Sequence, residues 1–298
     1  MTTLTRLIRT SVAGLLGLVL AGCATHINEP ERIPELAETD FQVREGVTYS
    51  PPRWPQALQA DLYLPQVETP APAVLMVHGG GWERRSREDM TWLAEALAGH
   101  GFMVMNIDYR FAPEFTFPAQ LHDLQVAMGW LRDHAGELNL DPDRIGAFGF
   151  SSGAHLVALL ATVASSDSEL NEPHGGPHTR PGAVVAGGLP ADLVAFGSGK
   201  LIRQFLGGNL EQMPETYRAA SPITHVTANS PPFFLFHGGL DGLVPESQAR
   251  NFRARLAEHG VENQLYIMHL RGHILSFASA GTVMDEAMAF LDQHLEGP

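Results

Sequence analysis

The chain has 298 residues, of which 44% are apolar and 17% are charged, so it can bury a substantial core and does not have the composition of a disordered chain. Its 33 acidic and 19 basic residues give a formal net charge of −14. This charge argues against a nucleic-acid partner, because phosphate binding requires a basic surface. A short basic cluster, Arg84 to Arg87, is interpreted as a solvated loop or helix start.

The N-terminus has the layout of a secretory signal. Arg6 and Arg9 precede the apolar run SVAGLLGLVLAG, which is too short for a stable membrane span. The run ends in LAGC, Leu20 to Cys23, which resembles the lipobox of bacterial lipoproteins. The resemblance implies cleavage before Cys23, a lipid on its thiol, and attachment to a membrane of the bacterial cell envelope, with the outer membrane as the expected destination. The alternative is an ordinary signal peptide with an incidental cysteine.

Three segments are predicted along the chain. Residues 1–22 are a lipoprotein signal peptide, residues 23–42 are a polar tether, and residues 43–298 form a single globular domain. Cys23 is the only cysteine in the sequence, so the exported domain relies on its core rather than on disulfides.

From residue 58 onward, apolar strand patterns alternate with helical patterns. Strands are predicted over 58–65, 71–81, 102–110, 143–150, 182–188, 231–239 and 263–270. Helices are predicted over 87–101, 119–134, 151–164, 247–260 and 282–295. This alternation predicts an α/β fold, a mostly parallel sheet with helices on both faces, in which chemistry gathers at the carboxyl ends of the strands. The less regular section 197–218 is expected to form at most a small cap.

A reactive serine is predicted in GFSSG, Gly149 to Gly153. Ser151 lies in the pattern G-x-S-x-G, after a predicted strand and before a predicted helix, which is the context of a nucleophile on a strained turn. The flanking glycines let strand and helix approach closely, and Ser152 offers a backbone N–H at the start of the helix. The alternative is that Ser151 only caps the helix.

A second glycine-rich turn, HGGGW from His78 to Trp82, ends an earlier strand and leaves backbone amides uncovered, as stabilisation of a developing negative charge requires. A serine hydroxyl also needs a base, and the base needs an orienting acid. Hydrolases with this type of sheet have the chain order serine, acid, histidine, which Asp241 and His273 satisfy. Asp192 also follows a strand and is the rival candidate for the acid.

The other histidines near strand ends are expected to be structural. His155 falls one helical turn after Ser151 and is predicted to point into helix packing, while His237 and His269 end or lie in strands. The chain has no H-E-x-x-H motif or other ligand-spaced cluster, so no metal is expected, and the proposed chemistry needs no cofactor.

Six motifs in chain order, HGGGW, DYRFAPE, FPAQLHD, GFSSGAHL, SPPFFLFHGGLDGLVP and a final GH, resemble the α/β-hydrolase esterases around hormone-sensitive lipase. They are most similar to the alpha/beta-hydrolase-3 and BD-FAE-like carboxylesterases, over residues 45 to 298. Hormone-sensitive lipase members usually have an aspartate before the nucleophile, where this chain has Phe150, and this departure favours the BD-FAE-like branch.

The resemblance implies an α/β-hydrolase fold and assigns roles to matching positions. It implies that Ser151 is the nucleophile with Asp241 and His273 as its partners. The oxyanion-hole amides it implies are those of Gly79, Gly80 and Ser152, and the structural braces are Asp108, Tyr109 and Arg110.

We therefore expect the 43–298 domain to be a serine hydrolase that cleaves carboxylic esters through an acyl-enzyme intermediate. Short or medium acyl chains are the substrate class that the resemblance implies. The expected partners are a small-molecule ester and, through the anchor, a membrane. Two alternatives stay open: an amide hydrolase, either a peptidase or an arylformamidase, and a non-catalytic envelope lipoprotein that keeps the fold as a binding module.

Overall fold

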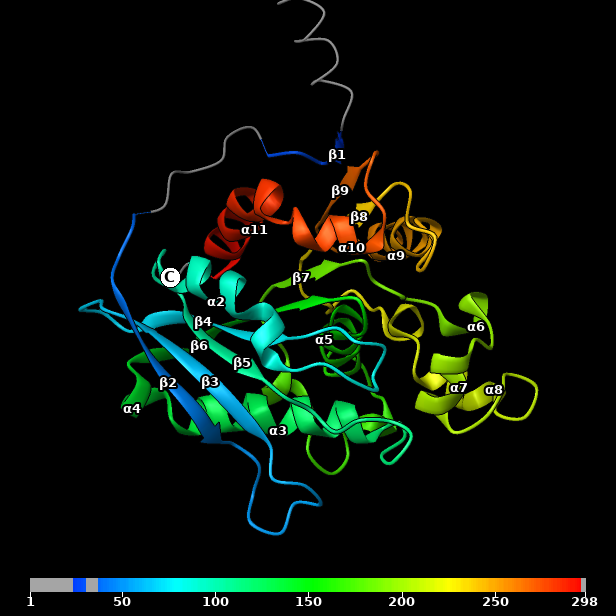
Figure 1. Ribbon diagram of the computed structural model, residues 1–298, viewed down its shortest axis with the longest axis horizontal. Coiled ribbons are helices and arrows are strands. Elements are labelled where there is room, and N and C mark those ends of the chain that lie inside the picture. The colour runs from blue at the N-terminus through cyan, green and yellow to red at the C-terminus, as the bar shows by residue number, and fades with distance from the viewer. Residues whose placement is uncertain (1–23, 31–36, 296–298) are drawn as a thin grey trace, which may run out of the picture.

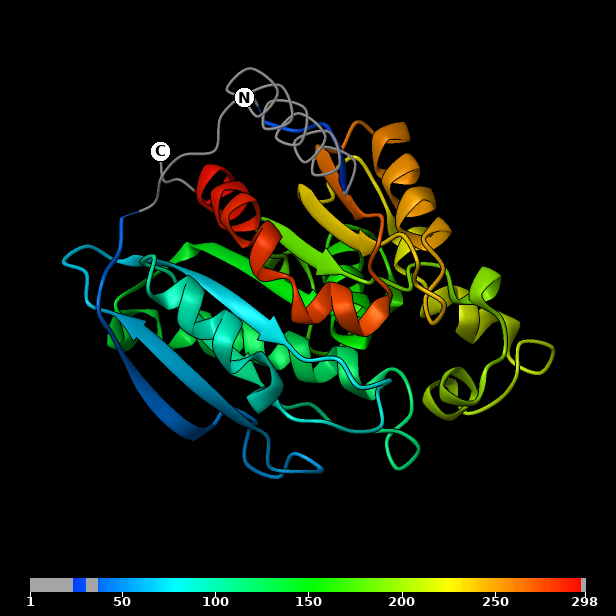
Figure 2. The same cartoon turned by 45° about the horizontal axis from the view of Figure 1, so that its top comes forward.

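The computed structural model describes residues 24–30 and 37–295, which form a nine-stranded sheet with helices on both faces (Figures 1 and 2). The strand order is β1-β9-β8-β7-β6-β4-β5-β3-β2. The strands are β1 (Ala24–Ile27), β2 (Phe41–Thr48), β3 (Gln59–Pro65), β4 (Ala71–Val77), β5 (Met103–Ile107), β6 (Leu140–Phe150), β7 (Val184–Gly187), β8 (Phe233–Gly238) and β9 (Asn263–Met268). The helices are α2 (Thr91–Ala98), α3 (Ala119–Asp133), α4 (Ala135–Leu138), α5 (Ser152–Val163), α6 (Leu193–Phe196), α7 (Lys200–Leu206), α8 (Pro214–Ala219), α9 (Ser247–Glu258), α10 (His273–Ala278) and α11 (Gly281–His294).

The centre of the sheet is parallel, from β5 through β4, β6, β7 and β8 to β9, whereas β1 and the pair β2–β3 are antiparallel at the two edges. Helices α2 and α11 cover one face, and α3, α5 and α9 cover the other (Figures 1 and 2). In β4, Val74 and Met76 belong to the core under the first pair of helices, while Leu75 and Val77 belong to the other core. Because both faces of the strand are buried, its apolar residues run without interruption. The predicted mostly parallel sheet with helices on both faces is confirmed.

The strands and helices predicted between residues 58 and 295 are present, with small shifts at their ends. The largest difference is the helix predicted over 87–101, which begins as a 3₁₀ turn at Arg87–Met90 and ends at Ala98. The sequence patterns did not reveal β2, the short helix α10 or the three short helices α6, α7 and α8. Residues of β2 are mostly exposed, so this strand exists because it pairs with β3 and not because of an apolar alternation.

The segment predicted as a tether, residues 23–42, is partly built into the sheet. Ala24–Ile27 forms β1 and pairs with β9, and β2 begins at Phe41 (Figure 1). His26 also approaches Glu286 of α11, with 2.7 Å between Nδ1 and Oε2. Backbone pairing satisfies a short polar edge strand as well as an apolar one, which is why the composition of the segment resembled a linker. In the part of the chain that the structure describes, none of the helices is long and apolar enough to span a membrane. The predicted signal peptide and Cys23 lie outside the described residues.

Candidate active site

Ser151 occupies a strained turn between β6 and α5. Its backbone has φ 56° and ψ −121°, a conformation that residues other than glycine rarely adopt. The Ser151 N–H donates to the Gly187 carbonyl of β7 at 2.8 Å, which fixes the turn on the sheet. The Ser151 side chain makes no cap hydrogen bond to α5, so the alternative of a simple helix cap is not supported.

The two flanking glycines of this turn are required by close packing. A Cβ on Gly153 would lie 2.1 Å from the Val77 carbonyl oxygen, and one on Gly149 would lie 2.4 Å from the Gly153 carbonyl oxygen. Both distances are far inside van der Waals contact. The start of α5 therefore lies directly against the ends of β4 and β6, as the pattern G-x-S-x-G predicts.

The structure brings Ser151, His273 and Asp241 together at the carboxyl ends of β6, β9 and β8. Ser151 Oγ lies 2.8 Å from His273 Nε2, and His273 Nδ1 lies 2.6 Å from Asp241 Oδ2. An ionised carboxylate only accepts hydrogen bonds, so His273 Nδ1 carries the proton towards Asp241. In the neutral imidazole Nε2 is then the acceptor for the Ser151 hydroxyl.

The Asp241 carboxylate is buried and held in one orientation. Its Oδ1 accepts from the backbone N–H groups of Leu243 at 2.9 Å and Val244 at 2.8 Å. Burial acts to raise the pKa of Asp241, but the hydrogen bond from His273 and those from the two amides outweigh it and leave the pKa below its ordinary value. Asp241 is therefore ionised at neutral pH.

The rival acid and the other histidines lie elsewhere. Asp192 caps α6 by accepting from the Ala195 N–H at 3.0 Å. His237 Nε2 donates to the Val244 carbonyl at 2.9 Å and lies 3.4 Å from Asp241 Oδ2, so it holds the loop that carries the acid. His269 Nε2 lies 2.7 Å from the Thr25 hydroxyl, at the junction of β1 and β9.

His155 lies in the helix packing, as expected from its position in α5. Its Nδ1 accepts from Trp82 Nε1 at 3.2 Å, because an indole N–H can only donate. The opposite nitrogen, Nε2, therefore carries the proton and donates to the Ala220 carbonyl at 2.7 Å. Burial lowers the pKa of His155 to about 4. This histidine is neutral at physiological pH and anchors the tryptophan that closes the HGGGW turn.

The HGGGW turn lies beside the serine turn. A Cβ on Gly79 would lie 3.2 Å from Ser151 Cβ, and Gly80 and Gly81 have φ +121° and +66°, which glycine adopts without strain. Ser152 is the first residue of α5, where backbone N–H groups have no partner within the helix. The amides of Gly79, Gly80 and Ser152 thus border the same space beside Ser151, and all three residues line the pocket there.

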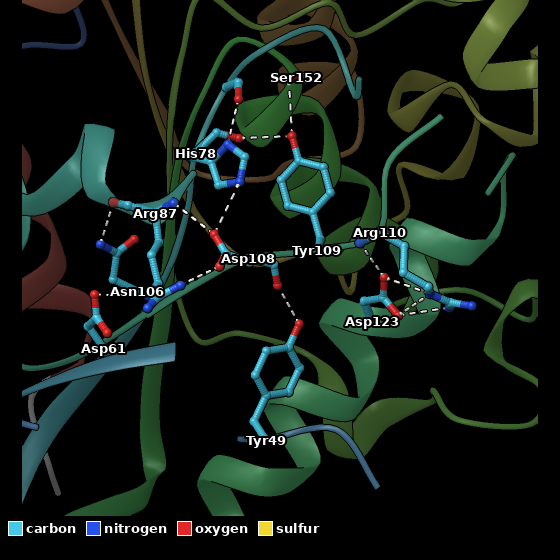
Figure 3. Close-up of polar contacts among 11 residues, drawn as sticks. Tyr49, Asp61, His78, Arg87, Asn106, Asp108, Tyr109, Arg110, Asp123 and Ser152 are labelled. Atoms are coloured by element: carbon cyan, nitrogen blue, oxygen red, sulfur yellow. Dashed lines mark hydrogen bonds and ion pairs between the residues drawn. The ribbon is translucent and has the colours of Figure 1, made fainter. Parts of the chain in front are cut away.

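Sequence reasoning missed His78, which orients this turn (Figure 3). The His78 ring donates from Nδ1 to the Gly79 carbonyl at 2.6 Å, and the Tyr109 hydroxyl donates to the His78 carbonyl at 3.2 Å. The two rings stack with centroids 4.6 Å apart. In a trans peptide the C=O and N–H point to opposite sides. Each hydrogen bond holds one peptide plane, and so fixes the direction of the Gly79 or Gly80 N–H that lies in the same plane. No signal in the sequence could have found this role, because it depends on the register of β4 and β5, which sets His78 and Asp108 side by side after the two strands.

The residues that the family resemblance implied to be structural braces take part in ion pairs and hydrogen bonds. Asp108 forms an ion pair with Arg87, and Asp123 accepts from Arg110 Nε at 2.8 Å (Figure 3). Arg87 also pairs with Asp61 at 2.9 Å. The cluster 84–87 was predicted to be a solvated loop or a helix start, and Arg87 is indeed the first residue of the 3₁₀ turn Arg87–Met90. Its side chain is held against β3 and β5, and only the first two arginines of the cluster are exposed.

A cavity of about 520 Å³ opens above Ser151 and His273. Its wall is largely apolar, and the side chains include Trp82, Phe150 and Phe277. Helix α7, in the section predicted to form at most a small cap, adds Leu201 and Ile202. Among the residues that the structure describes, no group of three or more histidine, cysteine or acidic side chains could hold a metal ion.

The sheet order, the serine turn after a parallel strand and the acid and histidine on the following strands define the α/β-hydrolase fold. Comparison with solved structures agrees. The fold matches a truncated carbohydrate esterase from gut microbiota with a TM-score of 0.77 at 23% identity, covering 89% of this chain and 99% of that one. It matches an esterase from Thermogutta terrifontis, solved with butyrate bound, with a TM-score of 0.70 at 25% identity, covering 88% and 97%.

A model of the BD-FAE family matches residues 60–256, and the chain belongs to this family. Among curated proteins it is 34% identical over 199 residues to esterase LipC of Mycobacterium tuberculosis, covering 63% of this chain and 48% of LipC. It is 30% identical over 229 residues to esterase LipQ of the same organism, covering 74% and 53%. The chain therefore spans about half the length of these curated relatives.

Proposed function

We propose that the protein is a carboxylesterase that uses Ser151, His273 and Asp241 as its catalytic triad. The observation that carries the proposal is the chain of two hydrogen bonds from Ser151 Oγ through His273 to Asp241, at the wall of an apolar cavity. The names of the curated relatives, which are esterases, support ester bonds as the substrate.

In the proposed reaction, Ser151 Oγ attacks the ester carbonyl carbon while His273 Nε2 takes the hydroxyl proton. Asp241 stabilises the imidazolium that forms. The amides of Gly79, Gly80 and Ser152 donate to the oxyanion of the tetrahedral intermediate. His273 then gives its proton to the departing alcohol, and water, activated in turn by His273, cleaves the acyl-enzyme and releases the carboxylic acid.

The proposed substrates are esters of short to medium acyl chains. A cavity of about 520 Å³ with an apolar wall fits a group of this size. The esterase from Thermogutta terrifontis was solved with butyrate bound, a short-chain carboxylate, which supports this range.

We also propose that the protein is a lipoprotein of the bacterial cell envelope, anchored through Cys23. The support is in the sequence: a signal-like N-terminus, the LAGC motif and the absence of any other cysteine. A lipidated cysteine carries more than one acyl chain, which makes membrane attachment stable.

The test compares full-length protein with the variant Ser151→Ala on p-nitrophenyl esters of increasing acyl length. We expect activity to peak at short chains and to fall by at least about 10³-fold in the variant, because the nucleophile is removed. Ser166→Ala, in the turn that follows α5, is the matched control and should keep full activity.

Faster turnover of a matched anilide than of the ester would instead indicate an amide hydrolase. Failure of a fluorophosphonate probe to label Ser151 in folded protein, together with no turnover of any ester, would contradict the enzymatic proposal and favour the binding module.

A further inference from the structure

Large apolar side chains are exposed in one region of the molecule. Among the described residues, seven large hydrophobic side chains are exposed, and five of them belong to the loop after β8, the loop after β9 or the start of α10. We call this group the apolar rim: Leu240, Leu243, Leu270, Ile274 and Leu275, each between 57 and 66% exposed. Five exposed large apolar side chains on neighbouring loops mark a contact surface.

The apolar rim surrounds the catalytic residues on one side. Leu240 and Leu243 flank Asp241, and Ile274 and Leu275 follow His273 directly in the chain. The two loops are tied to each other by a hydrogen bond from the Leu240 N–H to the Arg271 carbonyl at 2.9 Å. Leu243 and Ile274 also line the cavity. The rim is therefore continuous with the mouth of the active site.

The described chain begins close to the apolar rim, in the edge strand β1. β1 is antiparallel to β9, so its first residue, Ala24, pairs with Met268, the last residue of β9. Leu270 of the apolar rim follows two residues later. The hydrogen bond between Thr25 and His269 fixes this corner, which Figure 1 shows at the junction of β1 and β9. Cys23 directly precedes Ala24 in the sequence, so the proposed lipid is attached one residue before the start of β1.

The charges at the mouth favour an anionic partner surface. Three of the four charged Lys, Arg, Asp and Glu side chains that line the cavity are basic, namely Arg84, Arg85 and Lys200, against Asp89. Arg271, in the loop of the apolar rim, is exposed and adds a further positive charge. In a chain of net charge −14 this local excess is opposite to the average. Anionic phospholipid headgroups attract such basic residues.

We propose that the apolar rim rests on the anionic phospholipid membrane to which Cys23 is anchored, so that the mouth of the active site faces the bilayer and takes ester substrates dissolved in it. This inference rests on the proposed esterase activity and the proposed anchor. The anchor and the rim together supply two attachments on one face, which hold the domain in one orientation where a lipid alone would leave it free to rotate.

The orientation sets the class of substrate. An amphiphilic ester partitions into the bilayer with its acyl chain among the lipid tails. From there the chain can pass along Leu243 and Ile274 into the cavity without crossing water, because these side chains belong to both the rim and the cavity wall. The carboxylic acid and the alcohol produced by hydrolysis leave by the same mouth.

The test uses full-length protein, lipidated in a bacterial host and reconstituted on vesicles of phosphatidylcholine and phosphatidylglycerol. Cys23 is the only native cysteine and its thiol is blocked by the lipid, so a cysteine introduced by Leu270→Cys is the single position that a maleimide fluorophore can label. The matched control is Glu258→Cys. This residue ends α9, which leads into the amino-terminal end of β9, so it lies at the opposite end of that strand from Leu270.

We expect nitroxide-labelled lipids to quench the fluorophore at position 270 at least several-fold more than the one at position 258. Equal access of iodide from water to both positions, in protein that floats with the vesicles, would overturn the orientation while leaving the anchor intact. Protection of position 270 from both quenchers would mean that a second copy or another protein covers the rim, which also overturns the proposal. Maleimide labelling of the unmutated chain, without flotation, would show that the anchor itself is missing and would overturn both.

A kinetic measurement on the same vesicles tests the substrate class. The readout is the ratio of turnover of a fluorogenic ester with a medium acyl chain, held in the bilayer by a lipophilic alcohol group, to turnover of dissolved p-nitrophenyl acetate. We expect the double variant Leu240→Gln, Leu270→Gln to lower this ratio about tenfold. The variant loses part of the free energy that two leucine side chains gain when they move from water into the bilayer. Val43→Gln, an exposed apolar position on the opposite edge strand β2, should leave the ratio unchanged. An unchanged ratio in the double variant contradicts delivery from the bilayer.

Discussion

Asp241 shows how one side chain is prepared by its surroundings. One carboxylate oxygen is held by the backbone amides of Leu243 and Val244, so the other faces His273. Burial acts to raise the pKa of Asp241, and these hydrogen bonds lower it further than burial raises it. The result is a fixed negative charge that selects the tautomer of His273 with its free Nε2 towards Ser151.

The variant Asp241→Asn tests this arrangement at the scale of the residue. An amide cannot stabilise the imidazolium and can donate to Nδ1, which selects the wrong tautomer of His273. We expect kcat for p-nitrophenyl butyrate to fall about 10³- to 10⁴-fold with little change in the folded structure.

Asp192→Asn is the control, because asparagine preserves the cap of α6. A comparable loss of kcat in both variants would mean that the assignment of the acid to Asp241 is wrong.

At the scale of the element, the junction of β6 and α5 determines where the nucleophile lies. Gly153 sits against the carbonyls of Val77 and His78, at the end of β4. This contact sets the serine turn beside the HGGGW turn. A small displacement of α5 would therefore separate Ser151 from the amides of Gly79 and Gly80.

Gly153→Ala should both destabilise the protein and lower its activity. The added Cβ would lie 2.1 Å from the Val77 oxygen, so the helix must move, at a cost of about 1–3 kcal/mol in the free energy of unfolding. Urea unfolding and ester turnover measure the two effects.

The control for this prediction is Gly129→Ala in the middle of α3, where an added Cβ meets nothing within 4 Å. It should raise the free energy of unfolding by about 0.5–1 kcal/mol through helix propensity. A Gly153→Ala protein as stable and active as the unmutated one would contradict the close contact.

At the scale of the whole molecule, several buried or half-buried histidines link stability to pH. Burial lowers the pKa of both His155 and His122 to about 4, and it also lowers the pKa of His237 and His78. Each of these groups binds a proton more readily in the unfolded chain than in the folded one. Their contribution to the free energy of unfolding is therefore complete above the ordinary histidine pKa of 6.5. It is lost as the pH falls towards 4.

We expect the urea midpoint to decrease between pH 7.5 and pH 5, with His155 alone contributing about 2 kcal/mol. Protonation of this ring would place an N–H against the indole N–H of Trp82. The variant His155→Gln removes the titration and should show a smaller decrease. Identical pH dependence in the variant and the unmutated protein would show that His155 does not carry this linkage.

The sequence by itself determined the central fold and the candidate site residues. Alternating strand and helix patterns are local properties of the chain, and both faces of a parallel strand are buried, so β4 through β9 were evident from their apolar runs. The order of Ser151, Asp241 and His273 along those strands, and the glycines around the serine, are also properties of chain position and residue type. They predicted residues that the structure brings within hydrogen-bond distance.

Tertiary structure decided what depends on contacts between distant segments. The edge strands β1 and β2 exist through pairing with β9 and β3, which a polar sequence does not reveal. Asp192 and Asp241 both follow strands, and only the packing of β8 beside β9 brings Asp241 to His273. The orientation of the HGGGW amides by His78 and Tyr109, and the apolar rim beside the first residue of β1, likewise require three-dimensional proximity, because neither a register across a sheet nor the exposure of a side chain is encoded in local sequence.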